Sequence, residues 1–488
     1  MATIPTTTIG DNLEISRIVT GLWQVSGGHG PIDPEKAVSH MASLHGTGLT
    51  SFDMADHYGP AEELTGNLIR RLGSETAVQA STKWCPEPAE MTPEVVRKAI
   101  DRSRERLASS TIDLLQFHWW DYLDPRYIDA MLELAKLREE GLIANLGLTN
   151  FNTAHLRILL SLGIPIVSNQ IHYSLLDTRP AGEMTEVCSR HGIKLLCYGT
   201  VAGGFFSERW LNRPEPSDEE VADNWSRMKY MRFIRTAGGW NSFQNLLHTV
   251  HSVARKHQVS IANVAVRWVL QQPAVAAVLV GTRLGQSDHT EDNTHVFSFE
   301  LDRDDLATIE EARSALHPIP GDCGDEYRRP PYLTAAGDLS DHKTRSWRPA
   351  LCERHPDPPV DRVRHASGTP WEGIASYSRA LRRGETVTVS GTTATYGDRL
   401  IGTDDAAAQA EFCLDKIEAA IEALGGRLSD VIRTRIFVSH VARDWEAVAR
   451  AHGRRFAGVE PANTLVGAPL VGSGYLVEIE ADALIQGE

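Results

Sequence analysis

The sequence predicts an α/β fold of the (β/α)8 TIM-barrel type, followed by a separate, smaller α+β domain. Short apolar runs alternate with amphipathic stretches of helical spacing over the first part of the chain. About eight such units fit a barrel, whereas a doubly wound sheet would need a dinucleotide-binding fingerprint after its first strand, and none is found there. A Pro-rich stretch then precedes a region with a different pattern. With 488 residues, the chain is long enough for both domains.

The expected barrel strands are short, apolar and bounded by turn residues. They cover residues 17–24, 51–55, 77–84, 112–118, 143–149, 166–171, 194–198 and 276–281. Helices are expected between them, for example at residues 34–45, 61–72, 93–107, 127–140 and 153–162. The seventh unit is longer, because residues 241–256 and 261–271 both have helical spacing. We expect the barrel to occupy residues 1–316.

The pattern changes after the barrel. Residues 317–361 contain Pro-Ile-Pro-Gly, Arg-Arg-Pro-Pro and Pro-Asp-Pro-Pro without a sustained apolar period, which indicates a linker. In residues 362–488 we expect alternating strands at 386–390, 431–439 and 475–484, with helices at 406–424 and 445–456. Strands and helices in this order are typical of an α+β domain.

Charge and cysteine content limit the class of protein. The chain has 64 acidic and 49 basic residues, a net charge of −15 and no long Lys/Arg cluster, so we expect no nucleic-acid partner. The six cysteines are scattered without a C-x-x-C pair, which suits a reducing compartment. The sequence shows no leader-like start and no apolar run near the ~20 residues of a membrane span. We therefore expect a cytoplasmic protein with no membrane partner.

Four reactive side chains fall at or just beyond the C-terminal ends of predicted strands, where barrel enzymes carry their reactive groups. They are Asp53, Tyr58, Lys83 and His118. A Tyr hydroxyl has an ordinary pKa of about 10 and needs a nearby cation to donate its proton at neutral pH. Lys83 can supply that cation, Asp53 can hold it by ion pairing, and His118 can orient a carbonyl oxygen. The set lacks a hydride donor, which must come from a cofactor.

The surrounding motifs, Phe-Asp-Met-Ala-Asp-His-Tyr-Gly and Asp-Leu-Leu-Gln-Phe-His-Trp, resemble those of the aldo-keto reductases. The resemblance covers the barrel part of the chain. It implies that Asp53, Tyr58, Lys83 and His118 form the catalytic tetrad of an NADP(H)-dependent oxidoreductase. In such an enzyme Tyr58 is the general acid and base for a carbonyl or alcohol substrate.

The same resemblance implies eight cofactor-binding residues, which are Thr149, Asn150, Gln170, Tyr198, Gly281, Arg283, Gln286 and Asn293. The first three would bind the nicotinamide amide, and Tyr198 would stack on its ring. Gln286 and Asn293 would lie near the adenine. Arg283 would face the adenosine 2′-phosphate, which NAD lacks, so NADP(H) is the expected cofactor.

Two further sets of residues could belong to a functional site or could be purely structural. Trp23, Trp84 and Trp119 could line an aromatic substrate pocket, or they could simply pack the core. His248 and His251 share one face of a predicted helix, but no third ligand lies nearby in the sequence. We therefore expect no metal site.

The C-terminal domain resembles the Rid (YjgF) family, known for imine and enamine deaminases that assemble as trimers. The resemblance rests on Gly-Ile-Ala-Ser-Tyr-Ser-Arg-Ala, Val-Ser-Gly-Thr, Val-Ile-Arg-Thr-Arg-Ile-Phe-Val and Val-Glu-Ile-Glu-Ala. The positions that match the family's cleft are Tyr377, Ser390 and Glu478. Deaminating members clamp a substrate carboxylate with an Arg where this chain has Asn463, so catalysis, binding and assembly all stay open for this domain.

The combined expectation is a reductase of a small carbonyl or imine substrate fused to a Rid-like domain. One alternative is that both domains act on one imine-containing intermediate, and another is a non-catalytic NADP(H)-sensing protein. A homotrimer through the Rid-like domain is expected, because its strands offer more apolar positions than one sheet face uses. These positions are Val387, Val389, Ile432, Ile436, Val438, Leu476 and Ile479.

Overall fold

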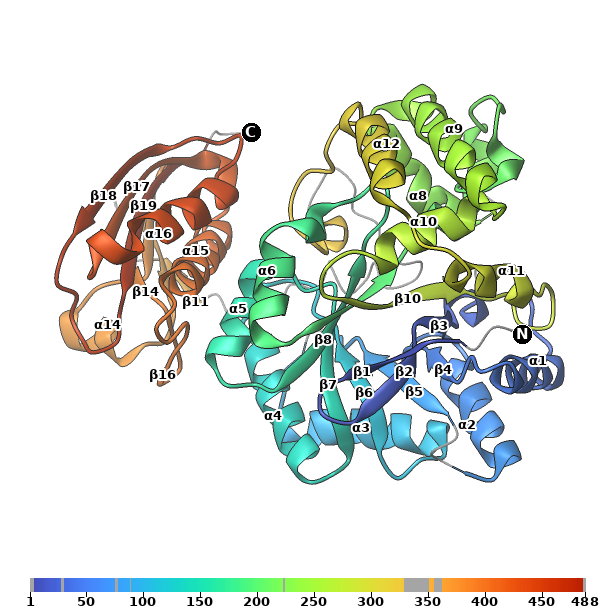
Figure 1. Cartoon of the computed structure of the whole chain (residues 1–488). Coiled ribbons are helices and arrows are strands. Elements are labelled where there is room, and N and C mark those ends of the chain that lie inside the picture. The colour runs from blue at the N-terminus through green and yellow to red at the C-terminus, as the bar shows by residue number, and fades with distance from the viewer. Residues whose placement is uncertain are drawn as a thin grey trace. The chain divides into compact units, whose positions relative to one another are not determined.

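The computed structural model describes residues 4–27, 30–74, 78–87, 89–222, 224–328, 351–354 and 362–485, the stretch 351–354 by its backbone alone. The chain forms two compact units, one built mainly from residues 1–344 and one mainly from residues 345–488. Figure 1 labels the elements of both. In the described part of the chain, no helix has the length and apolar character required to cross a membrane.

The first unit is a closed barrel of parallel strands, which confirms the predicted fold class. Neighbours along the chain are paired, and β10 returns to pair with β3. The strands are β3 (Ile18–Gly21), β4 (Ser51–Asp53), β5 (Gln79–Trp84), β6 (Ile112–Phe117), β7 (Ile143–Thr149), β8 (Ile166–His172), β9 (Lys194–Tyr198) and β10 (Val275–Gly281). Since all run in the same direction, their C-terminal ends lie at one mouth of the barrel.

Helices follow most strands and are capped by local signals. They are α1 (Pro34–Gly46), α2 (Ala61–Leu72), α3 (Pro93–Leu107), α4 (Tyr127–Glu139), α5 (Thr153–Ser161), α6 (Glu183–His191), α9 (Gly239–His257), α10 (Ile261–Leu270) and α12 (Arg303–Ser314). Asp33 and Thr92 accept hydrogen bonds from the first turns of α1 and α3, and each is followed by a Pro at the first helical position. Helices α1 and α3 therefore begin where the sequence places N-cap residues.

An antiparallel hairpin, β1 (Thr6–Ile9) and β2 (Leu13–Ser16), precedes the barrel. Its side chains Ile9, Leu13 and Ile15 belong to one buried cluster with barrel residues that include Leu114 and Ala277. Since these two barrel residues lie near the starts of β6 and β10, the hairpin packs against the N-terminal end of the barrel, opposite the mouth.

The first residues of the expected linker pack onto the barrel. We call residues 319–328 the strap. It contains a short 3-10 turn, η7 (Asp325–Tyr327), and its residues Ile319, Cys323, Glu326 and Tyr327 are buried. Of the remaining expected linker residues, 351–354 form a strand, β11 (Leu351–Arg354), so the linker prediction is wrong there, and 329–350 and 355–361 lie outside the described residues.

The second unit is an α+β domain with one sheet in the order β11-β12-β13-β14-β19-β17-β18. The strands are β11 (Leu351–Arg354), β12 (Arg362–Ala366), β13 (Ala380–Arg383), β14 (Thr386–Thr393), β17 (Val431–Val438), β18 (Ala462–Gly467) and β19 (Val477–Leu484). Helices α15 (Ala406–Ala423) and α16 (Val441–Arg455) contact its central strands, and a short helix, α14 (Pro370–Ala375), lies between β12 and β13. The α+β assignment is confirmed.

The seven apolar strand positions that suggested a trimer are mostly buried inside the domain itself. Val387, Val389, Ile436, Val438, Leu476 and Ile479 are all buried, and Ile432 alone of the seven is exposed. On the alternate positions of β17 and β19, Arg435 pairs with Glu480 at 2.7 Å and Arg433 with Asp482 at 2.9 Å. Six of the seven residues are therefore buried within the chain itself, so the surplus argued from the sequence is wrong. The homotrimer stays a prediction.

Candidate active site

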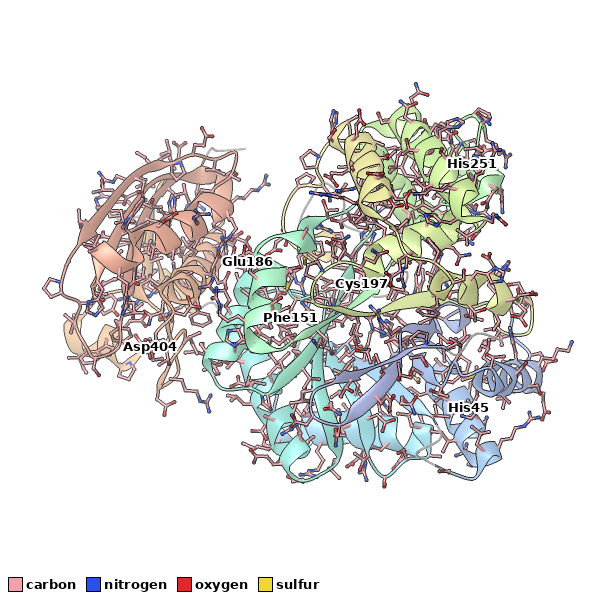
Figure 2. The ribbon with its side chains drawn as sticks, viewed as in Figure 1. His45, Phe151, Glu186, Cys197, His251 and Asp404 are labelled. Carbon is pink, nitrogen blue, oxygen red and sulfur yellow. The ribbon has the colours of Figure 1, made fainter. Side chains whose placement is uncertain are left out.

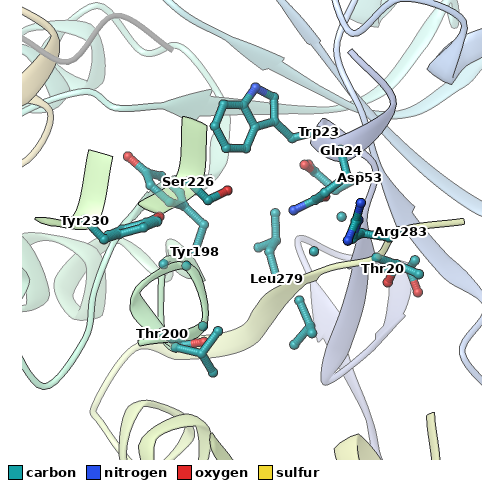
Figure 3. A pocket seen from close by; sticks show the side chains of 18 of the residues that line it. Thr20, Trp23, Gln24, Asp53, Tyr198, Thr200, Ser226, Tyr230, Leu279 and Arg283 are labelled. Atoms are coloured by element: carbon teal, nitrogen blue, oxygen red, sulfur yellow. The ribbon is translucent and has the colours of Figure 1, made fainter. Parts of the chain in front are cut away.

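A cavity of about 660 Å³ lies at the C-terminal mouth of the barrel. Figure 3 shows Trp23, Asp53 and Arg283 on one side of it and Tyr198, Ser226 and Tyr230 on the other. The structure brings most of the predicted site residues to this one cavity. Its lining includes Asp53, Tyr58, Lys83, His118, Thr149, Asn150, Gln170, Tyr198, Gly281, Arg283 and Asn293.

Lys83 and Asp53 form a buried ion pair at the bottom of the site. Lys83 Nζ lies 2.5 Å from Asp53 Oδ2 and donates to the Met54 carbonyl oxygen at 2.9 Å. The other carboxylate oxygen of Asp53 accepts from Gln116 Nε2 at 2.9 Å and from Gln170 Nε2 at 2.6 Å. These bonds compensate for burial of both charges, so the ammonium is held in one place.

Tyr58 and His118 stand beside this pair. Lys83 Nζ lies 5.1 Å from the centroid of the Tyr58 ring, and the His57 ring contacts it edge-on at 4.8 Å. His118 Nδ1 lies 3.1 Å from the Thr149 carbonyl oxygen. Because a carbonyl only accepts, Nδ1 of His118 carries a proton, which fixes the orientation of the ring. Tyr58, Lys83 and His118 therefore line the same cavity as Asp53.

Tyr198 is anchored through its hydroxyl. The hydroxyl donates to Asn150 Oδ1 at 2.7 Å and lies 3.2 Å from Glu326 Oε1 and 3.3 Å from the Tyr327 hydroxyl oxygen. Burial, together with the neighbouring Tyr327 and Glu326, raises the pKa of Tyr198 well above its usual value, so the phenol stays neutral. Two of these partners belong to the strap.

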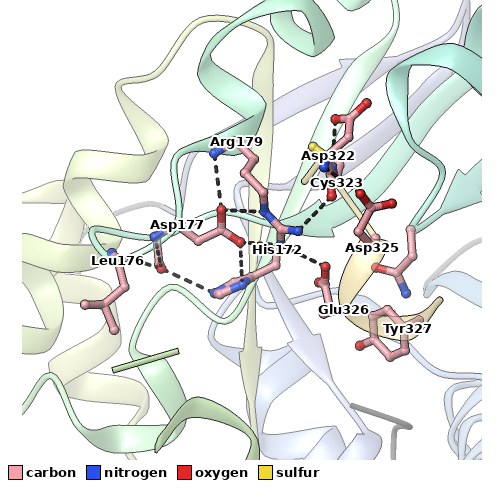
Figure 4. A network of polar contacts seen from close by, with 12 residues as sticks. His172, Leu176, Asp177, Arg179, Asp322, Cys323, Asp325, Glu326 and Tyr327 are labelled. Carbon is pink, nitrogen blue, oxygen red and sulfur yellow. Dashed lines mark hydrogen bonds and ion pairs between the residues drawn. The ribbon is translucent and has the colours of Figure 1, made fainter. Parts of the chain in front are cut away.

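A network of charged residues fixes the strap to the barrel (Figure 4). Arg179 Nη2 lies 2.6 Å from Asp177 Oδ2 and 2.8 Å from Glu326 Oε2, and His172 Nδ1 lies 2.9 Å from Asp177 Oδ2. Burial alone would raise the pKa of Asp177, but Arg179 and His172 hold it below its usual range. Gly324 has a φ of +79°, and a Cβ there would lie 2.1 Å from the Asn150 carbonyl oxygen. Only glycine permits so close an approach.

The predicted pocket tryptophans separate into two groups. Trp23 lines the cavity, whereas neither Trp84 nor Trp119 is among the described lining residues. Both pack against Phe117, with ring centroids at 5.6 and 5.9 Å. Trp120 lines the cavity in their place, and its ring lies 4.2 Å from that of His118. Gln286 also lies outside the described lining; it is exposed and donates to the Pro31 carbonyl oxygen at 3.2 Å.

Sequence reasoning missed the residues that the long connection after β9 brings to the cavity. This connection forms η4 (Ala202–Gly204), η5 (Glu208–Trp210), α7 (Asp218–Ala222) and α8 (Trp225–Thr236). Lys229 and Tyr230 on α8 line the cavity, as does Tyr327 of the strap. The segments η4, η5 and α7 are too short to show an apolar period, and the buried face of α8 includes the polar residues Ser226 and Lys229.

One cluster of possible metal ligands lies beside the tetrad. The side chains of Asp56, His57 and Cys85 offer ligand atoms within 4.8 Å of one another. They follow two different strands, so a search along the sequence does not join them. His248 and His251, which the sequence analysis considered, lie on α9. Figure 2 labels His251.

In the second unit, Arg379 connects two of the predicted cleft residues. Its guanidinium donates to the Tyr377 hydroxyl at 3.1 Å and to the carbonyl oxygens of Ser390 and Gly391 at 3.2 and 2.6 Å. A Cβ on Gly391 would lie 2.0 Å from Glu478 Oε1, so this carboxylate rests against the same backbone. Burial, with Glu480 nearby, raises the pKa of Glu478. Sequence reasoning missed Arg379.

Asn463 is not part of this group within one chain. It lies on β18 opposite Thr434, and its Nδ2 donates to Thr434 Oγ1 at 2.9 Å. Glu478 pairs instead with Phe437, three residues farther along β17. Strand spacing and rise place Asn463 roughly 10 Å along and roughly 10 Å across the sheet from Glu478.

Comparison with known proteins decides the family of the barrel. The sequence model described as "Aldo/keto reductase family" matches residues 17–314. The chain belongs to the aldo/keto reductase family. It is therefore an oxidoreductase, of a family that generally uses a nicotinamide cofactor. "Probable aldo-keto reductase 1" of Glycine max is 28% identical over 309 residues, which are 61% of this chain and 86% of the relative.

Other relatives and structures agree with this membership. The "NADH-specific methylglyoxal reductase" of Escherichia coli is 23% identical over 330 residues, which are 62% of this chain and 97% of that protein. The structure of a glycerol dehydrogenase from Gluconobacter oxydans is 24% identical, with a TM-score of 0.54, and the match covers 64% of this chain and 97% of that one. The solved structure supports the barrel fold.

The C-terminal domain matches a second family. The model described as "Endoribonuclease L-PSP" matches residues 369–485. A member of the YjgF/YER057c/UK114 family from Mycobacterium tuberculosis is 40% identical; the match covers 25% of this chain and 99% of that chain, with a TM-score of 0.23. The match to the family model confirms the predicted Rid resemblance of this domain.

Proposed function

We propose that the barrel catalyses the reversible, NADP(H)-dependent reduction of a carbonyl compound with Tyr58 as the general acid and base. One observation carries the proposal. Lys83, fixed by Asp53 and the Met54 carbonyl, lies 5.1 Å from the Tyr58 ring in a cavity that also holds His118. A fixed ammonium stabilises the negative charge that develops on the Tyr58 oxygen as its proton leaves.

The lining of the cavity fits a nicotinamide dinucleotide. Asn150 and Tyr198 lie near the tetrad, and Arg283 and Asn293 line the same cavity after β10. In the proposal the first pair would hold the nicotinamide end and the second pair the adenosine end. The cofactor would supply the hydride. Arg283 favours the 2′-phosphate of NADP, because a planar guanidinium pairs well with phosphate oxygens.

The protein's own residues then carry the proton and exclude water. Tyr58 gives its proton to the carbonyl oxygen in reduction and takes it back in oxidation. His118, fixed by the Thr149 carbonyl, orients that oxygen, and Trp23 and Trp120 supply apolar walls. Asp53 acts through Lys83 and is a positioning residue.

A scan of cofactors and substrates tests this proposal. NADPH and NADH oxidation, and reduction of their oxidised forms, would be measured against aldehydes, ketones, sugars and cyclic imines. We expect carbonyl reduction that prefers NADPH. Tight NADPH binding without turnover on any substrate would instead support a sensing protein, and turnover on cyclic imines alone would support joint action with the C-terminal domain.

We further propose that the C-terminal domain assembles the chain as a homotrimer and offers a cleft for an imine or enamine. Its Rid-family membership supports this, as do three exposed apolar side chains, Trp371 (61%), Ile374 (73%) and Val471 (85%). Glu478 beside Gly391 is the acidic group of the proposed cleft. Asn463 lacks the charge to clamp a carboxylate, so the proposed ligand is not a carboxylate.

A further inference from the structure

Lys229 is a buried ammonium in the reductase cavity that the tetrad does not use. It lies on α8, lines the cavity and is 8% exposed. Among the residues that the structure describes, its Nζ has one hydrogen-bond partner, the Tyr327 hydroxyl at 2.6 Å. A Lys ammonium carries three donors. Two N–H groups of Lys229 are therefore without a described protein acceptor.

Three aromatic rings surround this ammonium. Lys229 Nζ lies 4.7, 5.5 and 4.8 Å from the ring centroids of Tyr198, Tyr230 and Tyr327. Burial acts to lower the pKa of Lys229, but the two tyrosines Tyr327 and Tyr230 together with Glu326 raise it above its usual value. The side chain therefore stays charged, and a buried charge without its full set of acceptors favours a ligand that supplies them.

Tyr327 places this cation close to the catalytic groups. Its ring lies 5.7 Å from that of His118 and 6.2 Å from that of Trp120. The next residue, Arg328, donates through Nε to the Trp119 carbonyl oxygen at 3.2 Å, which fixes the end of the strap. Tyr327 also lies beyond residues 17–314, which match the family. The pair joins a residue of the long connection, Lys229, to a residue of the strap, Tyr327.

We propose that Lys229 and Tyr327 are specificity-determining residues that bind a second oxygen of the substrate. The preferred substrate is then a carbonyl compound that carries a hydroxyl or carboxylate group away from the reacting carbon. This inference rests on the proposed reductase function, because the first oxygen is the one that Tyr58 and His118 receive. A substrate without the second oxygen leaves the Lys229 ammonium unsatisfied and loses affinity.

A matched set of rigid aldehydes tests the inference. Benzaldehyde, 3-(hydroxymethyl)benzaldehyde and 3-carboxybenzaldehyde would be compared on the wild type, Lys229→Met, Tyr327→Phe and, as a control, Lys98→Met. Lys98 is exposed on α3, outside the described cavity lining. We expect the wild type to prefer one of the two oxygenated aldehydes by kcat/KM, and Lys229→Met to reduce that preference on the order of 10- to 100-fold.

The change should fall on KM for the oxygenated aldehydes and should exceed any change for benzaldehyde in the same variant, while Lys98→Met leaves all three aldehydes unchanged. Whichever oxygenated aldehyde is preferred identifies the group as a hydroxyl or a carboxylate. No preference in the wild type, or an equal loss on all three aldehydes, overturns the inference. Tyr327→Phe gives the milder perturbation if Lys229→Met does not fold.

Calorimetric binding of 3-(hydroxymethyl)benzoate to the full chain with NADP separates this inference from the proposed function. If the wild type reduces none of the aldehydes but Lys229→Met weakens this binding at least tenfold, the proposed function fails and the second-oxygen site stands. If aldehydes are reduced but neither oxygenated group gains affinity, the proposed function stands and the site fails. Absence of both activity and binding overturns both.

Discussion

Tyr58→Phe is the most direct test of the proposed chemistry, because it removes one hydroxyl and leaves the remaining contacts in place. The Phe ring keeps the edge contact with His57 at 4.8 Å and stays 5.1 Å from Lys83 Nζ. The buried bonds between Lys83 and Asp53 do not involve Tyr58. We therefore expect the free energy of unfolding to change by less than about 1 kcal/mol.

The effect on turnover is expected to be far larger. Loss of a positioned general acid slows a reaction by on the order of 10² to 10⁴-fold. At about 1.36 kcal/mol per tenfold, this is an increase of about 3 to 5 kcal/mol in the activation free energy. In this variant Lys83 stays bonded to Asp53 and to the Met54 carbonyl oxygen, so the site keeps its cation but lacks the phenolic proton donor.

The assay is single-turnover oxidation of bound NADPH, with cofactor affinity measured in the same samples. Tyr230→Phe serves as a control, since Tyr230 lines the cavity but is not in the tetrad. We expect cofactor affinity within about twofold of wild type in both variants and slow chemistry only in Tyr58→Phe. Turnover of Tyr58→Phe within about threefold of wild type would refute the assignment of the general acid.

Other predictions concern stability, cofactor choice, assembly and pH. Lys83→Met should slow turnover. It should also lower the free energy of unfolding of the barrel by about 3 to 5 kcal/mol, because Asp53 stays buried without its cation. Urea unfolding measures this loss, and an unchanged midpoint would contradict it. Arg283→Ala should weaken NADPH binding at least about tenfold and leave NADH unaffected in a fluorescence titration, and equal wild-type affinities would argue against an NADP preference. A chain ending at Arg328 should scatter light as a monomer and the full chain as a trimer; a trimeric truncation would place the interface elsewhere. Burial, with Arg379 nearby, lowers the pKa of Lys416 from 10.5 to about 8. Between about pH 8 and pH 10.5 the unfolded chain binds more protons at this group than the folded chain does. The free energy of unfolding of the wild type, relative to Lys416→Met, should therefore rise by about 1 to 3 kcal/mol as the pH increases through this range. A difference that stays constant with pH would rule this out.

The sequence was sufficient for the barrel because its strands are apolar runs bounded by turns. The predicted strand at residues 143–149 coincides with β7 (Ile143–Thr149), and the predicted helix at 61–72 with α2 (Ala61–Leu72). The hairpin of β1 and β2 was not predicted, since Thr6–Ile9 is mostly polar and only four residues long. Its place is set by tertiary contacts of Ile9, Leu13 and Ile15.

The site was predictable where residues with reactive side chains fall near the ends of the parallel strands. Asp53 and Lys83 end neighbouring strands, and parallel strands bring such ends together without further information. Tyr327 was not predictable, because a Pro-rich segment without an apolar period indicates a linker. Its position depends on pairs such as Arg179 with Glu326, which are 147 residues apart in the sequence. Such long-range ion pairs leave no periodic signal in the sequence.

The strap also bears on how two such genes could be joined or exchanged. A recombination event that retained only residues 17–314 would inherit the whole tetrad but lose Tyr327 and Glu326, which hold the Tyr198 hydroxyl. An exchange beyond Arg328 would retain all the described lining residues of the cavity. The described pocket therefore depends on a stretch of chain that the matched family range leaves out, and a fusion joint that preserves this stretch lies after Arg328.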